Sequence, residues 1–211
     1  MFIKRLLIIS TLSILISACT SMSFKAMYEM ATFDPLSIQP DELVLALRAN
    51  ESVIITKGSV EIKLAYSVPA YGEYAAVDRK HTFLVDVDRI AQTKKTEASD
   101  LLPEILLDGI EVNEQVTILR LNQQDAKEMM ETQKLIKRYR DLDVKGKGMF
   151  SFSLNQSCII NSENLDSLFV DLFLKTSNEE SFFVFFDDLD VVAQAQEQQL
   201  DLKQVNKCNN H

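Results

Sequence analysis

Short stretches in which apolar residues alternate with more polar ones recur along the chain, and a single long helical pattern interrupts them. Residues 43–48, 60–66, 83–88 and 150–154 each place an apolar side chain at every second position. A period of two is typical of half-buried β-strands. Together with the helical pattern at 123–142, these stretches predict an α+β fold: a strand-rich, mainly antiparallel sheet with one long helix packed on it.

The helical pattern at 123–142 has the features of an amphipathic helix. Asn122 can cap the first turn with its side chain, and Asp125 suits the positive end of the helix dipole. Apolar residues lie toward one side and charged residues toward the other, namely Met129, Ile136, Tyr139 and Leu142 against Lys127, Glu131, Lys134 and Arg138. We therefore expect the apolar side to cover the sheet.

The C-terminal part of the chain predicts a hairpin. Residues 168–174 and 182–186 are nearly all apolar, and the polar residues 177–180 lie between them. Continuous apolar runs of this kind are typical of central strands buried on both faces. Residues 187–202 are polar and are interpreted as a last helix, whereas residues 101–107 fit either a short helix or a strand.

Length and composition are those of an ordinary folded protein. The chain has 211 residues, of which 46% are hydrophobic and 25% charged. We assign residues 34–211 to a single globular domain, and a division into two subdomains near Gly146 is the less favoured alternative. The net charge of -9 and the pI near 4.8 argue against nucleic-acid binding, which needs a basic face.

The first 20 residues have the order of a bacterial lipoprotein signal. Lys4 and Arg5 precede an apolar run at 6–16, which is too short to span a bilayer and fits the core of a signal peptide. The next residues, Ile16-Ser17-Ala18-Cys19, resemble the lipobox of Gram-negative bacterial lipoproteins. The short run and the polar residues after it disfavour the alternative, an uncleaved membrane anchor.

The lipobox resemblance implies a cellular location. Residues 1–18 would be removed as a signal peptide, and Cys19 would carry a diacylglyceryl thioether and an acyl chain such as palmitate on its amine. Two or more acyl chains anchor a protein firmly. Residues 19–33 would form a lipidated tether. Thr20 replaces the Asp that retains some lipoproteins in the inner membrane, which favours the outer membrane with the domain facing the periplasm.

A second, shorter resemblance covers residues 33–48. The segment Phe33-Asp34-Pro35-Leu36 leads into the first predicted strand and is similar to the start of uncharacterised envelope lipoproteins. This resemblance implies an envelope lipoprotein. It implies no activity, so no functional residue is transferred from it.

Cys158 and Cys208 remain once Cys19 carries lipid. In an oxidising periplasm such a pair predicts one disulfide, which would close a loop of about 50 residues and stabilise the fold by about 4 kcal/mol. The alternative is two unpaired thiols. We expect no metal site, because a Cys-x-x-Cys spacing is lacking and His81 and His211 are the two histidines of the sequence.

Motifs for catalysis are missing from the sequence. It contains no Walker loop, GxGxxG, GxSxG or HExxH. We interpret His81 as a surface residue. Two groups of carboxylates could in principle bind calcium or act as acid and base, namely Asp86 and Asp88, and Asp187, Asp188 and Asp190. Neither lies in a glycine-spaced calcium loop, so we interpret them as solvated surface charge and expect no enzyme and no cofactor.

Two groups of residues are candidates for binding a partner. The first is basic and lies at the end of the predicted helix and just after it: Lys134, Lys137, Arg138, Arg140, Lys145 and Lys147. It could contact lipid phosphates, lipopolysaccharide or an acidic partner, or it could simply favour the helix dipole and solubility. The second is a predicted loop at 66–74 that contains Tyr66, Tyr71 and Tyr74. Exposed tyrosines suit recognition, although they also cover sheet edges.

These observations favour a non-enzymatic outer-membrane lipoprotein that serves as an accessory or scaffold subunit of an envelope assembly. The alternative is a periplasmic lipid or small-ligand binding module. Its pocket would be lined by Phe150, Phe152, Phe169 and Phe173, which fit an ordinary core more simply. An envelope hydrolase is the least supported hypothesis.

Overall fold

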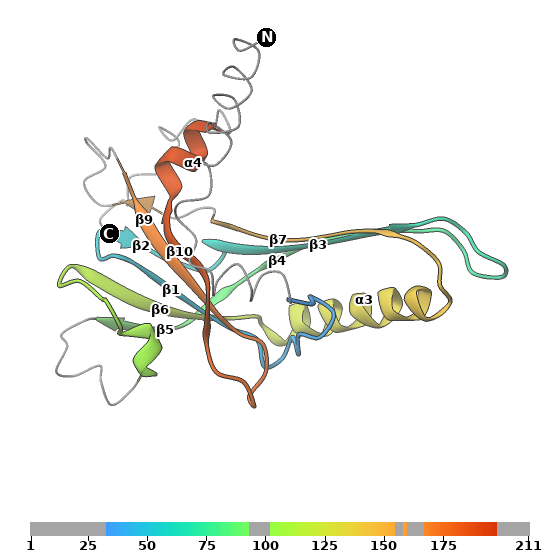
Figure 1. The fold of residues 1–211 in the computed structure, drawn as a ribbon, viewed down its shortest axis with the longest axis horizontal. Coiled ribbons are helices and arrows are strands. Elements are labelled where there is room, and N and C mark those ends of the chain that lie inside the picture. Colours follow the sequence, from blue (N-terminus) through green and yellow to red (C-terminus); the bar gives the residue numbers. More distant parts are fainter. Residues whose placement is uncertain (1–32, 93–101, 155–157, 160–166, 198–211) are drawn as a thin grey trace, which may run out of the picture.

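The structure is a computed structural model that describes residues 33–92, 102–154, 158–159 and 167–197 (Figure 1). Its strands are β1 (Val44–Asn50), β2 (Val53–Ile54), β3 (Val60–Val68), β4 (Val77–Leu84), β5 (Asp86–Gln92), β6 (Glu114–Arg120), β7 (Lys147–Leu154), β8 (Cys158–Ile159), β9 (Phe169–Lys175) and β10 (Phe183–Asp190). Its helices are α3 (Gln123–Asp141), α4 (Val191–Glu197) and a 3-10 turn at Glu104–Leu106. The described fold is thus α+β in the broad sense, mostly antiparallel β with a minor helical part.

The largest sheet has five strands in the order β10-β9-β1-β6-β5, with β1 at its centre. Leu45 and Leu47 of β1 pack into the main core on one face, whereas Val44 and Ala46 pack into a second cluster on the other. The strand predicted at residues 43–48 is confirmed as β1, but it is buried on both faces rather than half-buried, because the segment around the 3-10 turn covers the second face. Leu45 and Leu47 have larger apolar side chains than Val44 and Ala46, which gives the alternation, but both pairs are apolar enough to be buried.

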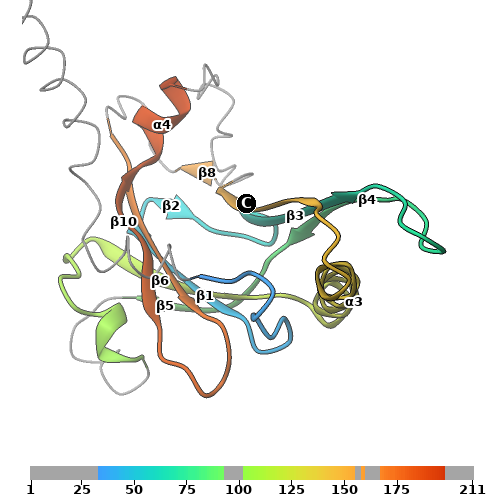
Figure 2. The ribbon, with the colours of Figure 1, turned by 45° about the vertical axis from the view of Figure 1, so that its right-hand side comes forward.

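A smaller sheet has three strands in the order β4-β3-β7 and lies across the main core from the five-stranded sheet (Figures 1 and 2). Residues 83–88, predicted as one strand, are divided between the two sheets. The chain turns from β4 into β5 at Val85, which is fully buried and donates its backbone N–H to the Val60 carbonyl at 3.0 Å. The predicted single sheet is therefore replaced by two main sheets, which the chain connects at Val85 between β4 and β5.

The long helix is confirmed as α3, which ends one residue before the predicted boundary. The Asn122 side chain accepts a hydrogen bond from the Asp125 N–H at 2.9 Å, as the predicted cap requires. Met129 and Tyr139 are buried on the side facing the three-stranded sheet. Figure 2 shows α3 end-on beside this sheet. Buried Gln133, which the apolar pattern did not mark, donates to the Pro35 and Ile38 carbonyls.

The predicted C-terminal hairpin is formed by β9 and β10, but these strands are not both central. β9 is buried along most of its length, whereas β10 is an edge strand with two register shifts and an intermediate exposure. β10 also continues to Asp190, so the last helix begins at Val191 as α4. The ambiguous stretch 101–107 contains the 3-10 turn.

Several predictions fall on residues outside the described ranges. These are the lipobox with Cys19, the tether up to residue 32, and Cys208. The backbone of Cys158 pairs with Ile54 in the small β2–β8 sheet. The lipid anchor and the Cys158–Cys208 disulfide therefore stay predictions. Among the described residues, no helix combines the length and the apolar character that crossing a membrane requires.

Candidate interaction surface

The β3–β4 hairpin and the C-terminal half of α3 extend side by side to one end of the molecule (Figure 1). The hairpin continues beyond its regular strands to a tip in which Tyr71 and Tyr74 form an isolated antiparallel bridge. Each residue donates its N–H to the other's carbonyl at 2.9 Å. These mutual bonds give the tip a defined backbone, and Tyr71 remains 52% exposed there.

Tyrosine side chains hold the hairpin against the helix. The Tyr139 ring of α3 lies 6.1 Å from the Tyr74 ring in an edge-to-face arrangement and 6.3 Å from the Tyr66 ring. The Tyr139 hydroxyl donates to the Ala75 carbonyl at 2.5 Å. Edge-to-face aromatic pairs contribute about 0.5–1.5 kcal/mol each beyond their buried area. The tip is therefore fixed to α3 by ring packing and by one hydrogen bond.

Tyr66 has a structural role, which corrects its assignment as a partner-binding residue. It belongs to β3 and is only 5% exposed. Burial, and secondarily the nearby Tyr139, raises the pKa of the Tyr66 hydroxyl above its ordinary value of 10.0. Gly146 lies directly against its ring, because a Cβ at this position would be 2.6 Å from the Tyr66 Cε2 atom. The predicted loop at 66–74 accordingly begins only after Val68, where β3 ends.

Three of the predicted cations lie beside the hairpin tip. Lys134, Lys137 and Arg138 are exposed on α3, and together with Tyr74 they line a groove of about 410 Å³ that also includes Asp141 and Leu142. Within the described part of the chain, none of the three cations forms an ion pair. We call the exposed Tyr71, the half-buried Tyr74 and these three cations the distal surface.

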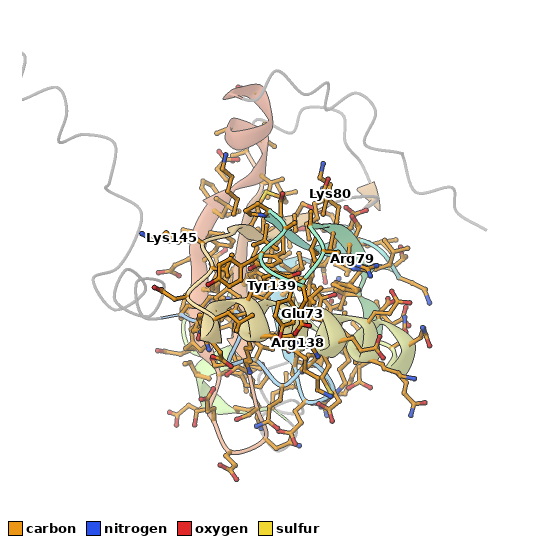
Figure 3. All side chains as sticks on the ribbon, turned by 90° about the vertical axis from the view of Figure 1, so that its right-hand side faces the viewer. Glu73, Arg79, Lys80, Arg138, Tyr139 and Lys145 are labelled. Carbon is orange, nitrogen blue, oxygen red and sulfur yellow. The ribbon has the colours of Figure 1, made fainter. Side chains whose placement is uncertain are left out.

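The other predicted cations differ in their surroundings. The Arg140 Nη1 atom lies 3.7 Å from the Asp34 Oδ2 atom, so the charge of Arg140 is partly offset within the molecule. Lys145 and Lys147 are exposed between α3 and the start of β7. Seen end-on, Lys145 lies to one side of the hairpin tip, and Arg79 and Lys80 lie to the other (Figure 3).

Arg79 and Lys80 were missed as candidates. In β4 they pair with Tyr66 and Ala65 of β3, and this register places them on the same end of the molecule as the basic helix. In the sequence they lie far from the basic group of α3. They could have been found only by predicting that residues 60–84 form a hairpin and which residues of its two strands pair.

The remaining candidate residues have structural explanations. His81 lies within β4, stacks on Phe83 with a ring separation of 5.7 Å, and has its Nδ1 atom 3.9 Å from a Glu128 carboxylate oxygen. Asp86 and Asp88 pair separately with Lys57 at 2.9 Å and with Arg120 at 3.0 Å. Each of these three side chains thus has its own partner, and they do not converge on a common site.

The three aspartates at the end of β10 have different surroundings. Asp190 accepts hydrogen bonds from the N–H groups of Val192 and Ala193 and so caps α4. Burial is the main cause that raises the pKa of Asp187, and the neighbouring carboxylates Asp171 and Asp188 add to it. Over the described ranges, no group of three or more His, Cys, Asp and Glu residues is arranged to hold a metal ion.

The four phenylalanines proposed to line an acyl-chain pocket do not come together. Phe150 and Phe152 pack on the main core, with rings 5.1 Å apart. Phe173 lies in the second cluster on the opposite face of the five-stranded sheet, and Phe169 is 51% exposed. The ligand-binding hypothesis thereby loses its proposed pocket.

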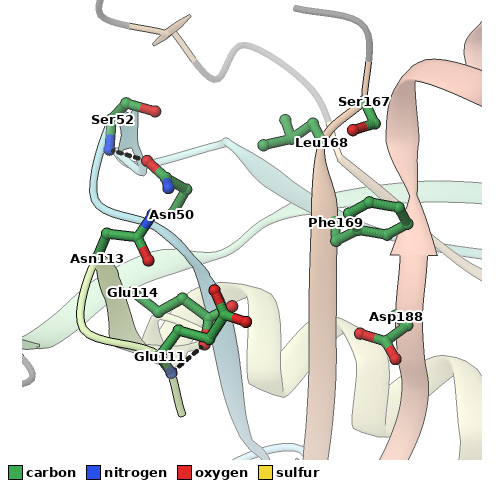
Figure 4. A pocket seen from close by; sticks show the side chains of 9 residues that line it. All are labelled: Asn50, Ser52, Glu111, Asn113, Glu114, Ser167, Leu168, Phe169 and Asp188. Atoms are coloured by element: carbon green, nitrogen blue, oxygen red, sulfur yellow. Dashed lines mark hydrogen bonds between the residues drawn. The ribbon is translucent and has the colours of Figure 1, made fainter.

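A second cavity of about 330 Å³ lies at one end of the five-stranded sheet and shares no lining residue with the groove of the distal surface (Figure 4). Its lining includes carboxylates, amides and one exposed ring, namely Glu111, Glu114, Asp188, Asn50, Asn113 and Phe169. The Glu114 carboxylate accepts the Glu111 N–H at 2.9 Å, and Asn50 accepts the Ser52 N–H at 2.9 Å. These polar groups stabilise their own loops.

Comparison with known protein families, with curated proteins and with solved structures found no match to this chain.

Proposed function

We propose that the protein is a lipid-anchored, non-enzymatic lipoprotein of the outer membrane that faces the periplasm and serves as an accessory or scaffold subunit of an envelope assembly. The lipobox at residues 16–19 supports the anchor and the location. The distal surface supports the role of a subunit, because it presents recognition residues at an end of the body.

The observation that carries the proposal is the convergence of two groups that are distant in the sequence. Tyr71 and Tyr74 come from the hairpin tip, and Lys134, Lys137 and Arg138 come from α3. Tyrosine and arginine are enriched at the energetically important positions of protein interfaces. A surface that combines them, held rigidly by Tyr139, loses little conformational entropy when a partner binds.

Labelling with a palmitate analogue in the native bacterium tests the anchor. We expect the wild-type protein to be labelled and to fractionate with the outer membrane. The Cys19→Ser variant should remain unlabelled and should lose this fractionation. Equal labelling of both proteins would contradict the assignment of Cys19.

Site-specific photocrosslinking in the same cells tests the role of the distal surface. A crosslinker at Tyr71 should give one defined adduct with an envelope protein, identified by mass spectrometry. A crosslinker at Val112, which is 96% exposed in the loop before β6, is the matched control. The Tyr71 adduct should disappear when Lys134, Lys137 and Arg138 are changed to Glu, and it should persist in Lys127→Glu. Identical adducts at Tyr71 and Val112, or insensitivity to the charge reversal, would contradict the proposal.

A further inference from the structure

We propose that the groove of the distal surface binds an acidic peptide segment of a partner protein, with one apolar side chain of the segment inserted between Tyr74 and α3. This inference rests on the proposed function and names the chemistry of the partner at that same surface.

Charge gives the first argument. Lys134, Lys137 and Arg138 are spaced i, i+3 and i+4, so they share one face of α3. They are exposed, and no ion pair within the described residues offsets them. The chain as a whole carries a charge of -9, so this face is opposite in sign to the rest of the protein. An occupant with carboxylates is attracted to this face and repelled by most of the remaining surface.

The shape of the groove gives the second argument. Tyr74 and Leu142 supply apolar surface between the cations, and the volume of about 410 Å³ has room for one large side chain and adjacent backbone. Burying an aromatic or aliphatic side chain there supplies affinity that charges alone do not. The expected segment therefore combines Asp or Glu residues with an aromatic or large aliphatic residue.

Two acidic residues of this end favour a peptide over a membrane surface. Asp141 lies in the groove, and Glu73 lies at the exposed hairpin tip (Figure 3). A bilayer presents phosphates across this whole end and would bring some of them close to these two carboxylates, whereas a peptide can place its carboxylates beside the cations alone. A peptide can also donate a backbone N–H to the Asp141 carboxylate while its own carboxylates contact the cations.

Rigidity gives the last argument. The mutual Tyr71–Tyr74 hydrogen bonds and the hydrogen bond from Tyr139 to the Ala75 carbonyl hold both walls of the groove before any occupant arrives. Because the walls are already ordered, binding a segment costs mainly the entropy of the segment itself. This is the arrangement expected of a site that recognises a flexible acidic segment.

The test uses the lipidated protein in phosphatidylcholine nanodiscs and a phage library of random 12-residue peptides. Empty nanodiscs remove peptides that bind lipid. We expect enrichment of peptides that contain several Asp or Glu residues and one aromatic or large aliphatic residue. For a synthetic peptide of the selected sequence, Kd should rise at least about tenfold between 50 and 300 mM salt, because salt screens exposed charges.

Matched variants locate the binding site. Changing Lys134, Lys137 and Arg138 together to Gln keeps helix propensity and should weaken peptide binding by at least about tenfold. Lys127→Gln changes an exposed residue in the N-terminal half of α3 and should leave Kd within about twofold. Circular dichroism and urea unfolding confirm that both variants fold like the wild type. If neutral or basic peptides are enriched, or if the triple variant binds normally, the inference is wrong.

Other occupants give different results. Binding to phosphatidylglycerol vesicles that requires the same cations and is not inhibited by the peptide would identify a membrane surface as the occupant. A salt-sensitive dimer that is lost in the triple variant would identify a second copy of the chain. Either result overturns the inference. A defined Tyr71 adduct in cells without acidic peptide selection refutes this inference alone, whereas peptide selection without an adduct refutes the proposed function.

Discussion

Arg48 and Asp171 form a buried ion pair between β1 and β9, and removing one partner should lower the free energy of unfolding. The two residues are direct neighbours on β1 and β9, with side chains only 10% and 7% exposed and an N–O distance of 2.6 Å. The Asp108 carbonyl accepts a further hydrogen bond from the guanidinium, and the Phe173 ring lies 5.4 Å from it. The second Asp171 oxygen accepts the Asp188 N–H at 2.7 Å.

Changing Asp171 to Leu leaves the Arg48 charge buried without its counterion. Breaking a buried ion pair in this way costs about 3–5 kcal/mol. The Asp108 carbonyl and the Phe173 ring still contact Arg48, so we expect the lower end, about 3 kcal/mol. With a urea m-value of about 2 kcal/mol/M, the unfolding midpoint should fall by about 1.5 M.

The double variant Arg48→Met, Asp171→Leu separates the cost of an unpaired charge from the loss of the pair itself. Replacing a buried pair by apolar residues of similar volume is often neutral, so this variant should lie within about 1 kcal/mol of the wild type. Equilibrium urea unfolding followed by circular dichroism and by tyrosine fluorescence measures both variants and checks two-state behaviour. A single variant that loses less than about 1 kcal/mol, or a double variant as unstable as the single one, would refute the reasoning.

Three further predictions concern local structure. Gly146→Ala should lower the free energy of unfolding by about 1–3 kcal/mol because its Cβ meets the buried Tyr66 ring, whereas Gly148→Ala, whose nearest atom is 3.9 Å away, should be near neutral in the same urea titration. Asn122→Ala should destabilise the protein by about 1 kcal/mol through loss of the α3 cap, and a changed midpoint without loss of helical circular dichroism would support this. Asp187 has a raised folded pKa, so the native state favours its protonated form and loses stability as pH rises through that pKa. The urea midpoint of Asp187→Asn should therefore be higher than that of the wild type at pH 7. This difference should vanish below pH 3.8, where Asp187 is protonated in both states. Equal midpoints at pH 7 would contradict the argument that burial of Asp187 disfavours its charged form.

Features encoded locally could be predicted from the sequence. The α3 boundaries follow from the Asn122 cap and a 3.6-residue pattern, both contained within the segment itself. The alternation at residues 60–66 likewise identified β3, in which Ile62 and Leu64 are buried. Such patterns depend only on which side of a helix or strand faces the core. They can therefore be recognised without knowing which other elements pack against it.

Features set by distant neighbours could not be predicted. β1 is buried on both faces because it is the central strand of its sheet. The residues of β1 alone do not indicate that central position. The bend at Val85 divides one alternating stretch between two sheets without interrupting the alternation. Tyr66 was predicted to lie in an exposed loop. In the structure β3 continues past it, and α3 covers this part of the hairpin and buries the Tyr66 side chain.

The candidate site shows the same division. Its tyrosines and its basic helix were each identified from composition, but their convergence depends on the register of the hairpin and on the packing of Tyr139. Arg79 and Lys80 were missed for this reason, since they become part of the same end only through pairing with β3. The residue types of a binding surface can be read from a sequence more readily than their proximity.

The distal surface is supported by a cluster of its own. Tyr66, Val68 and Tyr139 form a small buried group separate from the main core, which lies between the two sheets. This group and the Tyr139 hydrogen bond to the Ala75 carbonyl hold the hairpin tip to α3 independently of the main core. Because these contacts order both walls of the groove before an occupant arrives, a change that removes one of them should weaken binding without unfolding the main core.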